Sequence, residues 1–231
     1  MTPATARSDF VAGAQTGLTL GSRTGRRKPA FLHGLLLAAL LLTGCHILPA
    51  PQADPARFYQ IGVKFTALPA SNVSGTLKIG LRPVELPAYL QNRAMVVRNG
   101  TEIRYEDNHR WAEPLDEAIA RIVRTRLFAA ATVAAVQLAP FPIDEPRDFD
   151  VTVRVLTCEG ARSADGKGTV QFTAIAEITR SDASHTVVWR KNILAPAAAW
   201  DGKDFSALAG LLDLAISTTG EDIAAALPAK K

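Results

Sequence analysis

Side chains that could carry catalysis or hold a metal are few and scattered in this 231-residue sequence. Beyond the apolar segment near residue 40, the histidines are His46, His109 and His185, which lie too far apart to form a local ligand pair. The sequence contains no GxSxG, HExxH, CxxC or phosphate-loop motif. We therefore expect a protein that is not an enzyme, with no catalytic residue, no metal and no cofactor.

The thiol of Cys45 indicates a different chemistry. It follows a mostly apolar run, residues 30–42, and the tetrapeptide Leu42-Thr43-Gly44-Cys45 resembles the lipobox of bacterial lipoproteins, whose cysteine is lipidated on sulfur and becomes the first residue of the mature chain. The run is shorter than the roughly 20 residues that span a bilayer. It is preceded by a basic region, as in signal peptides: Arg23, Arg26, Arg27 and Lys28. We predict a lipoprotein signal peptide over residues 1–44 and a lipid on Cys45; the alternative is an ordinary secretory signal with an incidental cysteine.

The charge of the chain changes when this leader is removed. The net charge is +4, with 26 Lys and Arg against 22 Asp and Glu. Residues 1–44 hold five of the basic residues and one acidic residue, so the remaining 187 residues carry 21 of each sign. A nucleic-acid-binding protein needs surplus cations to displace counterions from phosphates. We therefore exclude nucleic acid as a partner.

Cys158 is the second of only two cysteines. If Cys45 carries lipid, no intramolecular disulfide can form. Residues 149–158 alternate as a strand, with Val151, Val153 and Val155 on one side. This alternation predicts that Cys158 lies on the same side as Leu156, as a small core residue.

A short tether follows the lipidated end. Residues 45–56 contain Pro49, Pro51 and Pro55 and no apolar periodicity, which favours an extended segment of about 3.1 Å per residue. We expect it to hold one domain, residues 57–231, some 20 to 30 Å from a membrane at most.

Apolar periodicity predicts the elements of that domain. Pro83 and Pro87 indicate an irregular crossing or a single helical turn, and Asn99-Gly100 favours a tight hairpin turn. Pro114 and Asp204 are favourable helix starts. The expected strands are 58–61, 76–81, 94–97, 102–105, 133–138, 149–158, 169–179 and 186–194, the last three as an antiparallel meander, and the expected helices begin at 114 and span 204–227. This order predicts an α/β or α+β layered domain with a mixed sheet.

The segment 86–115 is dense in aromatic and arginine residues, which dominate interface hot spots. The candidate partner-binding residues are Tyr89, Leu90, Arg98, Arg110 and Trp111. Packing is an equal alternative for each of them. In that case Trp111 covers the start of the following helix, and Arg98 pairs with Glu102 or Glu106.

The same segment carries a resemblance to a known family. The sequence Leu86-Pro87-x-Tyr89-Leu90, then Val96-x-Arg98, then RWAEPL at 110–115, together with the lipobox and a terminal EDIAAAL segment, resembles the ABC-type transport auxiliary lipoproteins, also called paraquat-inducible protein C-like. Residues 91–94 depart from the Asp-Arg-Pro-Gln type of segment common in relatives. The resemblance implies a three-layer α/β domain with a mixed sheet, similar to the N-terminal domain of TolB.

The resemblance also implies a function and partners. Family members act as auxiliary components or adaptors of ABC-type systems built around mammalian-cell-entry (MCE) proteins, which carry lipids between the two membranes, and a homo-oligomer is possible. In the usual sorting pattern, Asp after the lipidated cysteine retains a lipoprotein in the inner membrane. His46 therefore indicates the periplasmic face of the outer membrane, with the inner membrane as the alternative. The second hypothesis is an autonomous periplasmic module that itself binds a lipid or another hydrophobic compound.

Overall fold

The structure is a computed structural model that describes residues 53–63, 74–163 and 165–229. The chain divides into two units, Met1–Ala53 and Asp54–Lys231, and the fold below is that of the second unit. The lipobox, Cys45 and His46 lie outside the described residues. Within the described part, none of the helices is long and apolar enough to cross a membrane.

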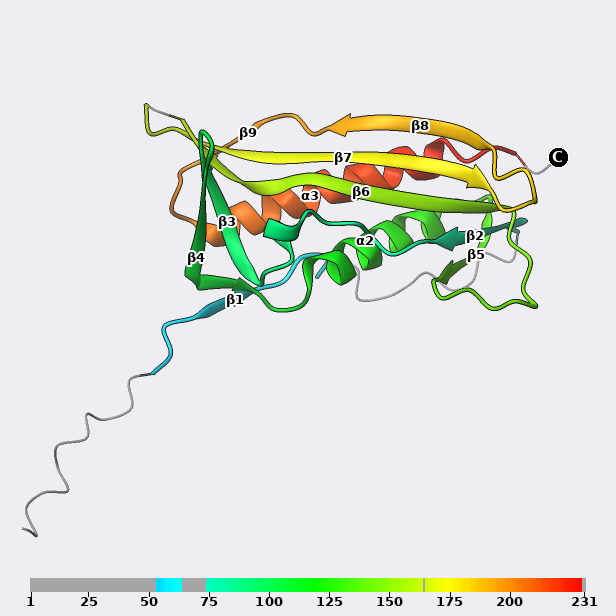
Figure 1. The fold of residues 1–231 in the computed structure, drawn as a ribbon, viewed down its shortest axis with the longest axis horizontal. Helices are drawn as coiled ribbons and strands as arrows, with labels where there is room; N and C mark the ends of the chain where they lie inside the picture. Colours follow the sequence, from blue (N-terminus) through cyan, green and yellow to red (C-terminus); the bar gives the residue numbers. More distant parts are fainter. Residues whose placement is uncertain (1–52, 64–73, 164, 230–231) are drawn as a thin grey trace, which may run out of the picture. The chain divides into compact units, whose positions relative to one another are not determined.

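Two long antiparallel strands form the centre of a nine-stranded sheet (Figure 1). They are β6 (Phe149–Arg162) and β7 (Gly168–Arg180). They pair with each other along one edge, and along the other edge each pairs with two shorter strands placed end to end. Along β6 these are β2 (Leu77–Leu81) and β3 (Ala94–Asn99), both parallel to it, and along β7 they are the antiparallel β8 (Val187–Leu194) and β9 (Ala198–Trp200).

Three further strands extend the sheet beyond β2 and β3. β4 (Glu102–Trp111) forms the expected hairpin with β3, β1 (Arg57–Tyr59) pairs parallel with β4, and β5 (Val133–Leu138) pairs parallel with β2. Between β2 and β3 the chain leaves the ladder for the 3-10 turn η2 (Ala88–Leu90), which confirms the crossing predicted from Pro83 and Pro87. The mixed sheet of the predicted α/β class is confirmed.

Two helices cover one face of the sheet. They are α2 (Leu115–Ala129) and α3 (Phe205–Ala225), which pack against each other (Figure 1). The predicted cap at Asp204 is confirmed, because its Oδ1 accepts hydrogen bonds from the backbone N–H groups of Ser206 at 2.8 Å and Ala207 at 3.1 Å. Of the three layers implied by the resemblance, the described residues supply two, the sheet and this helix pair.

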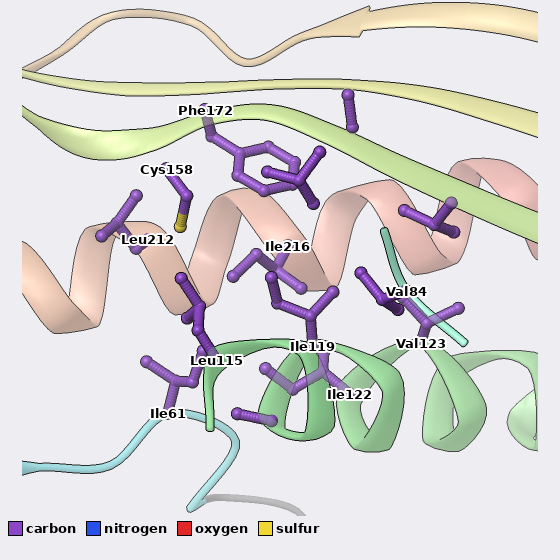
Figure 2. Packing of buried hydrophobic residues seen from close by; sticks show 14 of the residues in the cluster. Ile61, Val84, Leu115, Ile119, Ile122, Val123, Cys158, Phe172, Leu212 and Ile216 are labelled. Carbon is purple, nitrogen blue, oxygen red and sulfur yellow. The ribbon is translucent and has the colours of Figure 1, made fainter. Parts of the chain in front are cut away.

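The hydrophobic core lies between the sheet and the helix pair. Figure 2 shows Cys158 and Phe172 directed from the sheet toward Leu212 and Ile216 of α3, with Ile119 of α2 below them. All five side chains are at most 2% exposed. Burial of such apolar surface is the main favourable contribution to folding, at about 25 cal/mol per Å².

A β-bulge in β6 corrects one prediction. The pairing with β7 shifts between Val155 and Thr157, so the alternation of side chains inverts there. Leu156 is 41% exposed, whereas Cys158 is 2% exposed and joins the side occupied by Val155. The core position of Cys158 is therefore confirmed, but its predicted place on the side of Leu156 is wrong.

A buried carboxylate on β6 ties three chain segments together. The side chain of Asp150 is 3% exposed and accepts hydrogen bonds from Arg82 at 2.8 Å, Arg147 at 3.0 Å and Ser181 at 2.8 Å. Burial alone would raise the pKa of Asp150, but the hydrogen bonds from Arg147 and Ser181 and the two positive charges hold it below its ordinary value. A Cβ at Gly80 would lie 2.5 Å from Asp150 Oδ1, so the cluster requires glycine there.

This lowered pKa predicts a pH-dependent stability. Because folded Asp150 binds protons less readily than the unfolded chain, its contribution is complete above the ordinary pKa of 3.8 and is lost as the pH falls through the folded value. We expect Asp150→Asn to cost about 2–3 kcal/mol of unfolding free energy at neutral pH. The difference from wild type should shrink in urea titrations below about pH 4. Asp144→Asn, on an exposed loop, is the control, and an equal loss for Asp150→Asn at pH 7 and 3 would contradict the assignment.

Candidate functional site

The structure separates the candidate contact residues into buried and accessible ones. Leu90 is 2% and Trp111 is 4% exposed, and both belong to the hydrophobic core, as the packing alternative expects. Arg110 is exposed near the end of β4, where its Nε donates a hydrogen bond to the backbone oxygen of Asp107 at 2.8 Å. Tyr89 and Arg98 remain, and the fold brings these two together.

Tyr89 and Arg98 meet a third residue, Glu159, which the sequence analysis missed. Arg98 on β3 forms an ion pair through Nε with the Glu159 carboxylate on β6. Its guanidinium also lies 5.6 Å from the centre of the Tyr89 ring, within the range of a cation–π contact. The Tyr89 hydroxyl donates to the backbone oxygen of Leu156 at 3.2 Å. We call Tyr89, Arg98 and Glu159 the β6 triad.

The predicted pairing of Arg98 with Glu102 or Glu106 is wrong. In the β3–β4 hairpin, Glu102 lies opposite Asn99 and Glu106 lies opposite Met95. Successive residues of a strand point to opposite faces, so both glutamates are on the face away from Arg98. Pairing of β3 with β6 instead places Glu159 on the same face as Arg98.

The electrostatics of the β6 triad favour a fixed contact over proton transfer. The Glu159 side chain is fully buried, and its Oε2 has no hydrogen-bond partner among the described residues. The hydrogen bond to Glu159 is the main cause that raises the pKa of Arg98, while burial and then Glu159 raise the pKa of the Tyr89 hydroxyl. Arg98 therefore stays charged and Tyr89 stays protonated at physiological pH. The triad holds η2 beside β6, between the parts of β6 that pair with β2 and with β3.

No signal in the sequence identifies Glu159 as buried. Polar residues that alternate with core residues along a strand normally face water, and Glu159 occupies such a position after the β-bulge. It is buried because η2 and β3, more than 60 residues earlier in the chain, cover it. Only knowledge of the β3–β6 pairing could have revealed this.

An apolar groove lies between α3 and the end of β8. It is bounded by α3 and by the connection between β8 and β9, has a cavity volume of about 380 Å³, and includes Leu194, Pro196, Leu211 and Leu214 in its lining. Leu194 is 79% and Leu214 is 64% exposed. Asp222 lines one part of the groove and forms an ion pair with Lys191 at 2.7 Å.

One residue of this groove carries a weak signal in the sequence. Leu214 lies outside the apolar stripe of α3 formed by Leu208, Leu212 and Ile216. The helical periodicity therefore indicates that this leucine is exposed. Leu194 ends a strand and gives no such sign. The groove depends on how the β8–β9 connection approaches α3, which is a tertiary feature.

Cys158 and His109 are engaged in packing. Burial and the neighbouring Glu159 raise the pKa of the Cys158 thiol, which disfavours a reactive thiolate. His109 Nδ1 is 2.9 Å from the Tyr59 hydroxyl, and its ring stacks on Phe205 with centroids 3.9 Å apart. Within residues 53–63, 74–163 and 165–229, His, Cys, Asp and Glu side chains form no group of three that could hold a metal ion.

The β6 triad predicts an asymmetric response to mutation. Arg98→Met leaves the Glu159 charge buried without its partner and should cost about 1–3 kcal/mol of unfolding free energy. Adding Glu159→Gln should recover part of this loss, because the uncompensated charge is then removed. Urea unfolding of the two single variants and the double variant measures the coupling. Arg154→Met is the matched control, since its partner Glu85 is 51% exposed, and it should cost much less; strict additivity in the triad cycle would contradict the assignment.

Comparison with solved structures supports the fold. A Xanthomonas campestris protein, XCC0632 of the family DUF330, superimposes with a TM-score of 0.60 at 17% identity, covering 73% of this chain and 93% of its own. An uncharacterized protein gives a TM-score of 0.56 at 16% identity, covering 74% of this chain and 97% of its own. The PelC dodecamer from Paraburkholderia phytofirmans gives a TM-score of 0.41 at 17% identity, covering 71% of this chain and 96% of its own, which is too low to bear on the fold.

Sequence comparison supplies the family. No curated protein matches the chain. The family described as ABC-type transport auxiliary lipoprotein component matches residues 59–224, which includes α2, all but the last residue of α3, and all strands except the start of β1. This chain therefore belongs to the ABC-type transport auxiliary lipoprotein family.

Proposed function

We propose that the protein is a lipid-anchored adaptor of an ABC-type transport system built on an MCE-domain protein, held on the periplasmic face of the outer membrane. The observation that carries this proposal is the family match over residues 59–224, placed directly after a lipobox that ends at Cys45 and a proline-rich tether. Acyl chains on Cys45 would provide the anchor, since each buried methylene contributes about 0.8 kcal/mol. His46 supports sorting to the outer membrane.

The sheet face opposite the helices supports an adaptor role. It is not covered by a helix among the described residues, and it carries accessible ion pairs between Glu85 and Arg154 and between Glu177 and Arg190, both at 2.6 Å. Near these pairs, the β6 triad fixes η2 in place. A firm polar surface of this kind suits recognition of another protein, because its side chains lose little freedom on binding.

The adaptor function predicts a complex in cells. A tagged full-length chain, cross-linked in intact cells and purified, should recover the MCE-domain protein of the same cell. The Cys45→Ser chain, exported with an ordinary secretory signal in place of residues 1–44, should leave the membrane fraction and recover much less of that protein, because the anchor confines the wild-type chain to the membrane where the partner reaches it. Wild-type protein that recovers no MCE-domain protein would contradict the proposal.

The apolar groove favours a second candidate function, an autonomous module that binds a lipid or another hydrophobic compound. Its volume of about 380 Å³ falls within the range of small-molecule sites, and leucines line it. In this case the bound acyl chain would cover Leu194 and Leu214, which are exposed in the structure.

Binding to the groove is directly measurable. Cys45→Ser protein, exported with an ordinary secretory signal in place of residues 1–44 and purified from the periplasm, should bind a fluorescent fatty acid, and Leu214→Asp should weaken binding by at least about tenfold, because a carboxylate would face the apolar chain. Leu156→Asp on the opposite face of the sheet is the control, with unchanged affinity expected. No binding by the parent protein, or equal binding by both variants, would exclude the groove as a lipid site.

A further inference from the structure

The connection between β5 and β6 exposes an unusual amount of apolar surface. We call residues 139–148 the distal loop. Ile143 at its tip is fully exposed, and Leu138 just before it is 44% exposed. Pro140, Pro142 and Pro146 lie in the same loop and are also exposed. Exposed apolar residues that gather in one loop suit contact with another macromolecule.

The base of the distal loop is firmly held. Ala139 N–H donates to the Leu81 carbonyl at 3.2 Å, and Asp148 N–H donates to the Lys78 carbonyl at 2.8 Å, so both ends are fixed to β2. Asp148 Oδ2 also accepts a hydrogen bond from the Lys78 N–H at 2.8 Å.

The middle of the loop is held by Arg147. Its guanidinium lies 3.9 Å from the centre of the Phe141 ring, and its Nε donates to the buried carboxylate of Asp150. Glu145 accepts a hydrogen bond from the Gln137 side chain. The tip that carries Ile143 is thus presented by a fixed frame, so binding through it costs little conformational entropy.

The distal loop lies far from β1, the first described strand. β1 is the first described strand, and the segment that carries the predicted lipid enters the domain there. Figure 1 shows β1 toward one end of the sheet and the β5–β6 connection at the opposite end, beside the β7–β8 turn. The distal loop therefore lies at the end of the described sheet away from the strand where the N-terminal segment enters.

We infer that the distal loop is a docking element for a protein partner that offers an apolar pocket for Ile143 beside basic side chains. The basic side chains of the partner are inferred from the charge of the tip, because Asp144 and Glu145 follow Ile143 and are both exposed. Electrostatic complementarity of this kind sets the orientation of a contact more than its affinity. In the context of the proposed function, on which this inference rests, the partner is the periplasmic end of the transport assembly.

The test uses the tagged full-length chain in intact cells. Ile143→Asp should lower recovery of the cross-linked MCE-domain protein by at least about tenfold, since burial of the isoleucine is lost. Ile143→Leu should retain it, and Asp144→Lys should lower it. Val63→Asp is the matched control, a charge placed on another exposed aliphatic residue, outside the apolar groove. All variants should unfold at the same urea concentration as wild type, because Ile143 has no buried surface to lose.

Each result tests either the docking role of the distal loop or the adaptor function itself. Wild-type recovery with no loss for Ile143→Asp would overturn the docking role of the loop and leave the adaptor function standing. Failure of the wild type itself to recover the MCE-domain protein would overturn both. A photo-reactive amino acid at position 143 should cross-link to the MCE-domain protein, and cross-links only between two copies of this chain would contradict the inference.

Discussion

The long antiparallel ladder between β6 and β7 is the constraint on which the rest of the described domain depends. β6 has 14 residues and β7 has 13, and each is long enough to pair with two shorter strands along its second edge. This arrangement places β2 and β3 end to end, which forces the chain between them out of the sheet and creates η2. It also brings β8 and β9 into line, and the gap between them forms a wall of the apolar groove.

Two buried carboxylates on β6 convert this ladder into a rigid platform. Asp150 near the start of the strand holds Arg82 and Arg147, and Glu159 near its end holds Arg98. Each fixes a segment that has no regular partner of its own, the distal loop in the first case and η2 in the second. A buried carboxylate is stable only with such partners, so the strand and the segments it holds depend on one another.

The local features of the fold could be predicted from the sequence, whereas the candidate site could not. The strands, the hairpin at Asn99-Gly100 and the cap at Asp204 follow from residues that are neighbours in the chain. The β-bulge near Leu156 and the pairing of Arg98 with Glu159 depend on which strands meet in the sheet. Alternation along one strand carries no information about that choice, so it placed Cys158 on the wrong side and left Glu159 as an ordinary surface residue.

In the proposed function, anchoring, support and contact fall to different parts of one chain, and the distal loop lies at the end of the sheet away from β1. The central claim is that the working form is a complex with the transport assembly. Native mass spectrometry of the tagged protein extracted from membranes in mild detergent tests this most directly. We expect a mass that includes the MCE-domain protein, with acyl chains on this chain. A mass of this chain alone with a bound lipid would contradict the claim and favour the autonomous binding module.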